Sequence, residues 1–199
     1  MSRHGAAEVI GVDIEEELVE ASIALIASKE LSNSIKFLLV EPGPLPFQNN
    51  SFDVVFSKDA MVHILGKASL YKEVLRVLKP SGVFVAADWL WAEGAESNSI
   101  VQAWISGGPL KFAYTTPIEA TEAFQQAGYS EVSVINRSHL IQQSNRKETE
   151  ILSGPALKHL VSIVGEEMAM QRVNSTRGRQ ADLDSGNLIP SHLRGRKPA

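Results

Sequence analysis

The sequence contains no cysteine, and this absence excludes three kinds of chemistry at once. A disulfide framework, a thiolate zinc site and a cysteine nucleophile each need that residue. No apolar run is long enough to span a membrane, and the opening residues Met1–Gly5 do not begin a signal peptide. We therefore expect a cytoplasmic protein without membrane segments.

An excess of positive charge is also missing. The formal net charge of −4 gives no electrostatic basis for nucleic acid as a partner, because domains that bind it are usually basic. Basic residues gather only near the end, at Arg194, Arg196 and Lys197, where a solvated tail is the expectation. At 199 residues, with hydrophobic residues at 44%, the chain suits a single globular domain over residues 1–199.

Short apolar runs alternate with amphipathic stretches along the chain. Expected strands are Val9–Ile14, Ile35–Val40, Asp53–Ser57, Val83–Ala87 and Val132–Asn136, and expected helices are Glu15–Lys29, Ala68–Leu78, Pro117–Ala127 and Pro155–Arg172. Alternation of this kind predicts an α/β fold with a mainly parallel sheet and helices on both faces. Ile35–Val40 is apolar after Lys36, so we expect it to be buried on both faces.

Polar residues follow several of these strands, at the edge of an open α/β sheet where ligands bind. Asp13 closes the first strand, where a carboxylate can accept hydrogen bonds from ribose hydroxyls or can cap the next helix. Glu41 follows the second strand and could equally be a solvated loop residue. Ser57 and Asp59 end the third strand, after a proline-rich turn.

Asp59 and His63 form the sharpest pair of candidate residues. If the chain turns helical after the strand, a spacing of four places both on one face. A carboxylate beside an imidazole favours the protonated ring or fixes its tautomer. Such a histidine can accept a proton from an ammonium group as a general base. The alternative is a histidine that is hydrogen-bonded for structural reasons only.

These segments resemble those of class I S-adenosylmethionine-dependent methyltransferases. Leu45-Pro46-Phe47 followed by Phe52-Asp53-Val54-Val55 is similar to their post-strand segment. Ser57-Lys58-Asp59-Ala60-Met61-Val62-His63-Ile64 resembles the Ser-Arg-Asp-Ala-Ile-Leu-His-Ile stretch of the phosphoethanolamine N-methyltransferase group. Leu78-Lys79-Pro80-Ser81-Gly82, Asp88-Trp89 and the closing His192–Pro198 also fit, so that the resemblance covers nearly the whole chain from Val9.

The resemblance implies a Rossmann-like methyltransferase fold with S-adenosylmethionine as the cofactor and no metal. It implies that Asp13 and the neighbouring Ile14 bind the cofactor ribose and that Glu41 binds the adenine amino group. Pro42 departs from the family, since a backbone N–H usually faces adenine there and proline has none. The resemblance also implies that Ser57 and Asp59 at the strand end bind the cofactor, with Asp59 contacting its amino acid part, and that His63 and Asp59 are catalytic, with His63 as the base.

Aromatic residues after the fourth predicted strand are candidates for the acceptor pocket. Trp89 could hold a methylated ammonium by cation–π attraction, although core packing is the more common role of a tryptophan. Lys111, Phe112 and Tyr114 lie where phosphobase enzymes place arginine and tyrosine for the substrate phosphate. The sequence has no arginine between Arg76 and Arg137, which argues against phosphate recognition in that segment.

The first strand and the Gly-x-Gly-x-Gly loop of class I methyltransferases are absent from the sequence. The resemblance therefore implies a methyltransferase domain that is incomplete at its N-terminus. Our leading hypothesis is an N-methyltransferase acting on a small amine, phosphoethanolamine-like or a methylated glycine. The alternative is a catalytically inactive binding or scaffold protein with the same fold. A nicotinamide-dependent oxidoreductase is disfavoured, because no Gly-x-Gly-x-x-Gly motif occurs.

Overall fold

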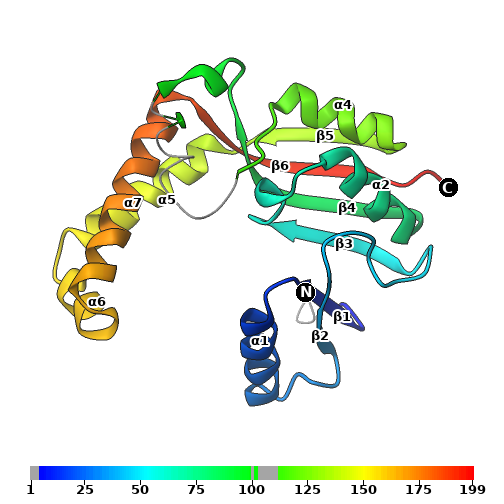
Figure 1. The fold of residues 1–199 in the computed structure, drawn as a ribbon, viewed down its shortest axis with the longest axis horizontal. Coiled ribbons are helices and arrows are strands. Elements are labelled where there is room, and N and C mark those ends of the chain that lie inside the picture. Colours follow the sequence, from blue (N-terminus) through cyan, green and yellow to red (C-terminus); the bar gives the residue numbers. More distant parts are fainter. Residues whose placement is uncertain (1–4, 100, 103–111) are drawn as a thin grey trace. The chain divides into compact units, whose positions relative to one another are not determined.

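The computed structural model describes residues 5–99, 101, 102 and 112–199. The chain divides into two compact units, one up to Gln48 and one from Asn49 to Ala199 (Figure 1). Each is described by itself below. The expectation of a single domain over residues 1–199 stays a prediction.

The first unit consists of two strands and one helix. Strand β1 (Val9–Asp13) pairs in parallel with β2 (Ile35–Leu39), and helix α1 (Glu16–Ser28) connects them. The prediction that the second strand is buried on both faces was wrong, since Leu38 is 39% and Leu39 is 48% exposed. A sheet of two strands with one helix cannot cover both of its faces.

The second unit contains a four-stranded mixed sheet in the order β3-β4-β6-β5. Its strands are β3 (Phe52–Lys58), β4 (Leu78–Trp91), β5 (Ser130–Asn136) and β6 (Leu188–Arg196). Strands β3, β4 and β5 run in one direction, whereas β6 lies between β4 and β5, runs in the opposite direction and pairs antiparallel with both. The three strands predicted in this unit thus share one direction, and the antiparallel β6, which was not predicted, makes the sheet mixed.

The C-terminal basic residues belong to this sheet and not to a solvated tail, so that prediction was also wrong. Arg194 and Arg196 lie in β6, and both guanidinium groups donate to the carboxylate of Glu131 in β5. Lys197 follows the strand, and its backbone N–H donates to the carbonyl oxygen of Gly82 at 2.9 Å. The positive charges are thus paired across neighbouring strands.

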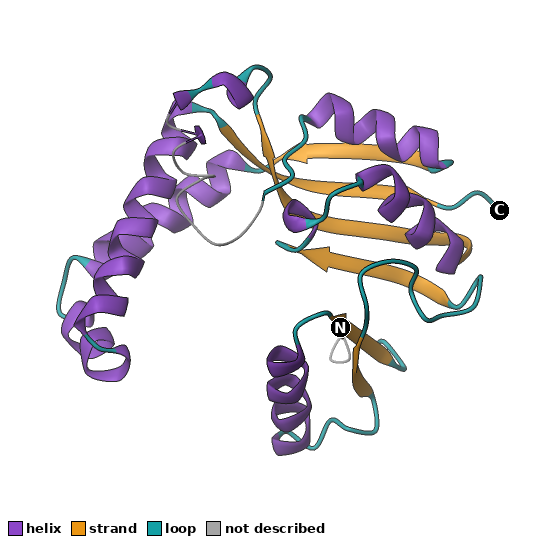
Figure 2. Cartoon of the chain, in the orientation of Figure 1, coloured by secondary structure: helices purple, strands orange, loops and turns teal. Residues whose placement is uncertain are grey.

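Helices α2 (Lys67–Val77) and α4 (Pro117–Ala127) cover one face of the four-stranded sheet (Figure 2). The predicted bounds of α4 are confirmed: Thr116 and Glu119 form a capping box at its start, and Gly128 ends it with φ 104°. Two short 3₁₀ helices, η2 (Met61–His63) and η3 (Ala95–Ser97), complete this part.

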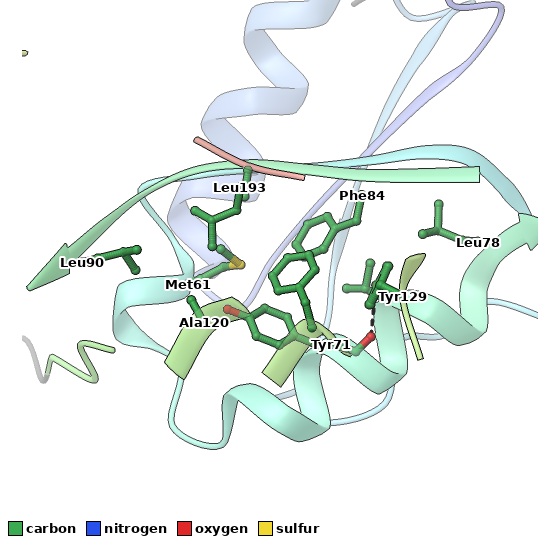
Figure 3. Close-up of a cluster of buried hydrophobic side chains, with 11 residues drawn as sticks. Met61, Tyr71, Leu78, Phe84, Leu90, Ala120, Tyr129 and Leu193 are labelled. Atoms are coloured by element: carbon green, nitrogen blue, oxygen red, sulfur yellow. Dashed lines mark hydrogen bonds between the residues drawn. The ribbon is translucent and has the colours of Figure 1, made fainter. Parts of the chain in front are cut away.

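The core between α2, α4 and the sheet is largely aromatic (Figure 3). Phe84 of β4 stacks on Phe124 of α4 with the ring centroids 5.5 Å apart. The Tyr129 hydroxyl donates to the carbonyl oxygen of Tyr71 at 3.1 Å, which satisfies a buried polar pair inside this cluster. Side chains on the other face of the sheet are more open, as Val54 and Phe56 are each 50% exposed.

Three helices lie between β5 and β6 in the chain, namely α5 (Ser138–Leu152), α6 (Ala156–Val164) and α7 (Glu166–Ser185). Helices α5 and α7 lie side by side (Figure 1). The sequence did not indicate α5, and the single helix predicted over Pro155–Arg172 is two helices. Gly165 separates them because its φ of 82° is not helical.

Candidate functional site

Strand β3 ends in the polar run Ser57-Lys58-Asp59, as predicted from the sequence. The backbone N–H of Asp59 donates to the carbonyl oxygen of Ala87 at 2.9 Å, which fixes this end of β3 against β4. Asp59 itself has φ 54°, a left-handed conformation that is uncommon for a residue other than glycine. Lys58 forms an ion pair with the Asp59 carboxylate. The chain therefore turns sharply at Asp59, with the carboxylate at the strand end.

The helical turn that follows does not include Asp59. It is the 3₁₀ helix η2, which begins at Met61 and ends at His63. The premise that Asp59 and His63 share one helical face was therefore wrong, because the left-handed Asp59 lies outside the helix. His63 is exposed at the end of η2, and its ring centroid lies 5.0 Å from that of Phe112. Their proposed catalytic roles stay predictions.

A stack of aromatic rings continues from His63. Phe112 stacks on Tyr114 at 5.5 Å, and Tyr114 stacks on Trp91 at 5.4 Å, so that Tyr114 has a ring on each side. Tyr114 is only 8% exposed, and this arrangement makes it part of a packed aromatic layer. Lys111, the other candidate in this segment, lies outside the described residues.

A cleft of about 270 Å³ opens where β3, β4 and β6 meet helices α5 and α7. Two of the predicted site residues, Asp59 and Trp89, line it. Ser57, His63 and Tyr114 are not among its lining residues. The cleft lies at the carboxyl ends of the parallel strands β3 and β4, the position in which open α/β sheets bind ligands.

Two arginines in this cleft were not recognised from the sequence. Arg137 directly follows β5, and its Nε donates to Nδ1 of His192 at 3.2 Å. Arg179 of α7 is hydrogen-bonded to two residues of α5: its Nε donates to Asn145 Oδ1 at 2.6 Å, and its Nη2 donates to Glu148 Oε2 at 2.9 Å. Arg137 has no carboxylate partner among the described residues. Its position directly after the predicted strand Val132–Asn136 is the sequence feature that could have identified it as a candidate.

Asp88 is a third residue of the cleft to which the sequence analysis gave no role. It is 4% exposed, and its Oδ1 atom has no hydrogen-bond partner in the described part of the chain. Burial raises the pKa of Asp88 to about 6, while the backbone N–H of Trp89, the Lys67 ammonium and the backbone N–H of Val62 act in the opposite direction. Asp88 also lines the cleft, and a carboxylate with a strongly raised pKa in a cleft is a candidate functional residue.

The first unit carries its own set of predicted residues at the ends of β1 and β2. Asp13 accepts a hydrogen bond from the backbone N–H of Glu15 at 3.1 Å, the contact expected for a residue that supports the start of α1. Ile14 is 55% exposed, and Glu41 and Pro42 are exposed in the turn after β2. Val40 donates its N–H to the carbonyl oxygen of Asp13 at 2.9 Å, so the two strand ends lie together.

The family of this chain follows from a comparison with known protein families. A family model described as a methyltransferase domain matches residues 2–148. The chain belongs to the methyltransferase domain family. This match confirms the resemblance to S-adenosylmethionine-dependent methyltransferases that the sequence showed, and the Rossmann-like methyltransferase fold expected from it.

Curated relatives of this methyltransferase domain act in different areas of chemistry, by their names. Sterol 24-C-methyltransferase ERG6B of Gibberella zeae is 36% identical over 97 residues, which are 48% of this chain and 25% of the relative. Phosphoethanolamine N-methyltransferase 1 of Arabidopsis thaliana is 32% identical over 81 residues, 41% of this chain and 16% of the relative. The match thus spans about a quarter or less of the length of these relatives.

Solved structures show the same fold over nearly the whole chain. Phosphoethanolamine N-methyltransferase 2 of Haemonchus contortus, in complex with phosphomonomethylethanolamine and S-adenosylhomocysteine, has a TM-score of 0.85 at 17% identity, covering 100% of this chain and 46% of that one. A protein described as a sarcosine dimethylglycine methyltransferase from Galdieria sulphuraria has a TM-score of 0.82 at 19% identity, covering 96% and 70%.

The described residues of the methyltransferase domain contain neither a metal-binding cluster nor a helix that could span a membrane. Among the described residues, no group of three or more histidine, aspartate or glutamate side chains could hold a metal ion. No helix in the described ranges combines the length and the apolar character needed to cross a bilayer.

Proposed function

We propose that this methyltransferase domain transfers a methyl group from S-adenosylmethionine to the nitrogen of a small amine that also carries an anionic group. Phosphoethanolamine-like compounds and methylated glycines both meet this description. The family match and the neighbours solved with S-adenosylmethionine or S-adenosylhomocysteine support the cofactor. The charged cleft between β4, β6 and α5 supports the substrate class.

The strand ends of the first unit fit the cofactor by the chemistry of their side chains. Asp13 has spare acceptor capacity for ribose hydroxyls, because one hydrogen bond from Glu15 uses only part of what a carboxylate can accept. Glu41 is exposed and can accept from an adenine amino group, and the exposed side chain of Ile14 offers an apolar surface. Pro42 has no N–H to donate, so adenine is held here by packing and by Glu41.

The polar lining of the cleft carries the choice of substrate. Arg137 is a cation whose only described side-chain partner is Nδ1 of His192, so it attracts an anionic group. Trp89, on β4 of the same cleft, suits an ammonium group through cation–π attraction. A cleft of about 270 Å³ with this lining favours a small zwitterion over a sterol.

The chemistry divides between the cofactor and the chain. When bound, S-adenosylmethionine supplies an activated methyl group. Asp59 would orient the cofactor at the end of β3, and Arg137 would orient the acceptor through its anionic end. His63 would take the proton from the acceptor nitrogen, which frees its lone pair for attack. The His63 side chain lies beside Phe112 and is exposed, so it can pass that proton to solvent.

The test is a titration followed by a transfer assay. Calorimetry with S-adenosylmethionine on the full chain should show binding, and radiolabelled methyl should then pass to phosphoethanolamine or to sarcosine. Arg137→Gln should raise the KM for that acceptor at least tenfold, whereas the control Arg146→Gln should not, because Arg146 pairs with Asp184. Transfer to a sterol but to neither amine would overturn the proposal.

A second candidate is a methyltransferase-fold binding or scaffold protein without activity. The absent Gly-x-Gly-x-Gly motif favours it, since those glycines let the backbone approach the cofactor closely. Absence of calorimetric binding by a chain that unfolds cooperatively would overturn the first function and leave the second as the alternative.

A further inference from the structure

The segment from Asp59 to Gly66 carries both predicted catalytic residues, yet it has little regular structure of its own. Asp59 and Gly66 are left-handed, with φ of 54° and 78°, and the 3₁₀ helix between them is three residues long. Its backbone bonds are few: His63 N–H donates to Ala60 at 3.2 Å and Ile64 N–H donates to Met61 at 2.9 Å. Something outside the segment must hold it.

Two charged side chains meet one peptide group at the centre of this segment. The Lys67 ammonium donates to the carbonyl oxygen of Met61 and, at 3.1 Å, to that of Ile64. The backbone N–H of Val62, on the other side of the same Met61–Val62 peptide bond, stabilises the Asp88 carboxylate. A cation therefore binds the oxygen of this peptide group, and the buried Asp88 carboxylate interacts with the N–H on its other side.

We infer that Lys67 and Asp88 are positioning residues, which fix the Met61–Val62 peptide group between them and thereby set the orientation of His63. Hydrogen bonds to charged groups are stronger than those between neutral groups, so this pair holds the peptide plane from both sides. The next peptide is fixed as well, because the carbonyl oxygen of Val62 accepts from Ala113 N–H at 2.7 Å. His63 follows immediately in the chain.

Both charged side chains, Lys67 and Asp88, are at least partly buried. Asp88 is 4% exposed and Lys67 is half-buried, so neither charge is well solvated, and each partly offsets the cost of burying the other. Desolvation lowers the pKa of Lys67, and the Asp88 carboxylate opposes that effect. The Asp59 carboxylate also raises the pKa of Asp88 by repulsion, which places Asp59 within the electrostatic reach of the pair. The two predicted catalytic residues are thus linked to one buried pair of charges.

Hydrogen exchange of the full chain without cofactor tests the inference, so its outcome is independent of whether the proposed methyl transfer occurs. Lys67→Met keeps the length of the side chain and removes the donor. The exchange rates of the His63 and Ile64 amides should rise at least tenfold, while those of Phe84 and Ala86 in the core of β4 stay unchanged. Lys67→Arg, which still donates, should restore most of the protection.

The matched control is Lys72→Met, because Lys72 is an exposed lysine on the same helix α2. It should leave the His63 and Ile64 amides at the wild-type rate. Equal loop exchange in wild type and Lys67→Met would overturn the inference. Exchange that rises equally in the loop and in β4 would also overturn it, since Lys67 would then stabilise the fold as a whole.

A second variant keeps the test decisive if Lys67→Met does not fold. Asp88→Asn retains an oxygen for the Val62 N–H but removes the charge, so exchange at Val62 should rise severalfold without an effect at Phe84. An unchanged rate at Val62 would count against the role of Asp88. Where the transfer assay shows activity, the catalytic consequence rests on the proposed function: kcat should fall at least tenfold in Lys67→Met and recover in Lys67→Arg.

Discussion

The side-chain nitrogen of Lys197 donates a hydrogen bond of 2.7 Å to the carbonyl oxygen of Leu78, the first residue of β4. The same nitrogen lies 3.4 Å from the carbonyl oxygen of Arg76 and 2.8 Å from the side-chain oxygen of Asn50. Lys197 thus binds the carbonyl groups at the end of α2, where a helix favours positive charge. The third residue from the C-terminus is a structural element of the second unit.

Replacing this lysine should therefore destabilise the fold. Lys197→Met should lower the free energy of unfolding by about 1–3 kcal/mol, because the carbonyl oxygen of Leu78 loses a charged donor. Urea unfolding measures the change. Lys158→Met is the control, since Lys158 is exposed on α6. Equal midpoints for both variants would mean that the contact contributes nothing.

Two glycines should respond to alanine in opposite directions. A Cβ at Gly195 in β6 would lie 2.7 Å from Phe124 Cδ1 and 2.8 Å from Tyr129 Cδ1, both in the buried cluster. Gly195→Ala should cost about 1–3 kcal/mol through overpacking. A Cβ at Gly178 in α7 meets nothing within 4 Å, so Gly178→Ala should stabilise the protein by about 0.5–1 kcal/mol. Thermal unfolding of the two variants should move apart, and shifts in the same direction would contradict the packing argument.

Asp88 should make stability depend on pH. Its pKa is raised from 3.8 to about 6 in the folded state, so the folded protein holds this proton more tightly than the unfolded chain. The contribution is therefore fully present below pH 3.8 and is lost as pH rises through 6. Over that window the loss is on the order of 3 kcal/mol, of which roughly half falls between pH 5 and 7.5.

Asp88→Asn cannot ionise and should lose this component. Urea unfolding at pH 5 and at pH 7.5 should show a smaller difference for the variant than for the wild type. Asp184→Asn is a suitable control, because hydrogen bonds from Gln180 and Arg146 lower the pKa of that exposed group. An identical pH dependence in wild type and Asp88→Asn would show that Asp88 titrates normally.

Asp13→Ala separates the two roles of that residue. If Asp13 binds the cofactor ribose, the variant should weaken S-adenosylmethionine binding by about 1.5–3 kcal/mol, the range for a hydrogen bond to a charged group. If it only supports the start of α1 through Glu15, binding stays normal and unfolding becomes easier. Calorimetry and thermal unfolding of the same sample distinguish these results.

Local signals in the sequence were sufficient where the structure is determined locally. The bounds of α4 follow from Pro117, the Thr116–Glu119 capping box and Gly128, all within the helix or next to it. Strand β6 was missed because Pro190 and the charges of Arg194 and Arg196 argue against an interior strand. The partner that permits those charges, Glu131, lies 63 positions earlier than Arg194. Only the folded topology brings them together.

The candidate site shows the same division. Asp59 and Trp89 could be found as polar and aromatic residues at strand ends, and both line the cleft. Arg137 follows the predicted strand β5 but was not singled out, and Arg179 comes from α7, beyond the helix predicted over Pro155–Arg172. The spacing of Asp59 and His63 in the sequence fits an α-helical turn, but Asp59 is left-handed and lies outside the 3₁₀ helix that contains His63. Asp59 is bonded through its N–H to Ala87 on β4, a contact that the spacing does not indicate.

Strand β6 is made last but lies between β4 and β5, and this order has a consequence for synthesis on the ribosome. After Asn136 the cell must translate as far as Leu188 before pairing can begin. At 5–20 residues per second, that interval is on the order of 3–10 s. During this time β4 and β5 present open edges to any nascent chain nearby. The nascent polypeptide therefore passes through a period in which its own sheet does not yet cover these two edges.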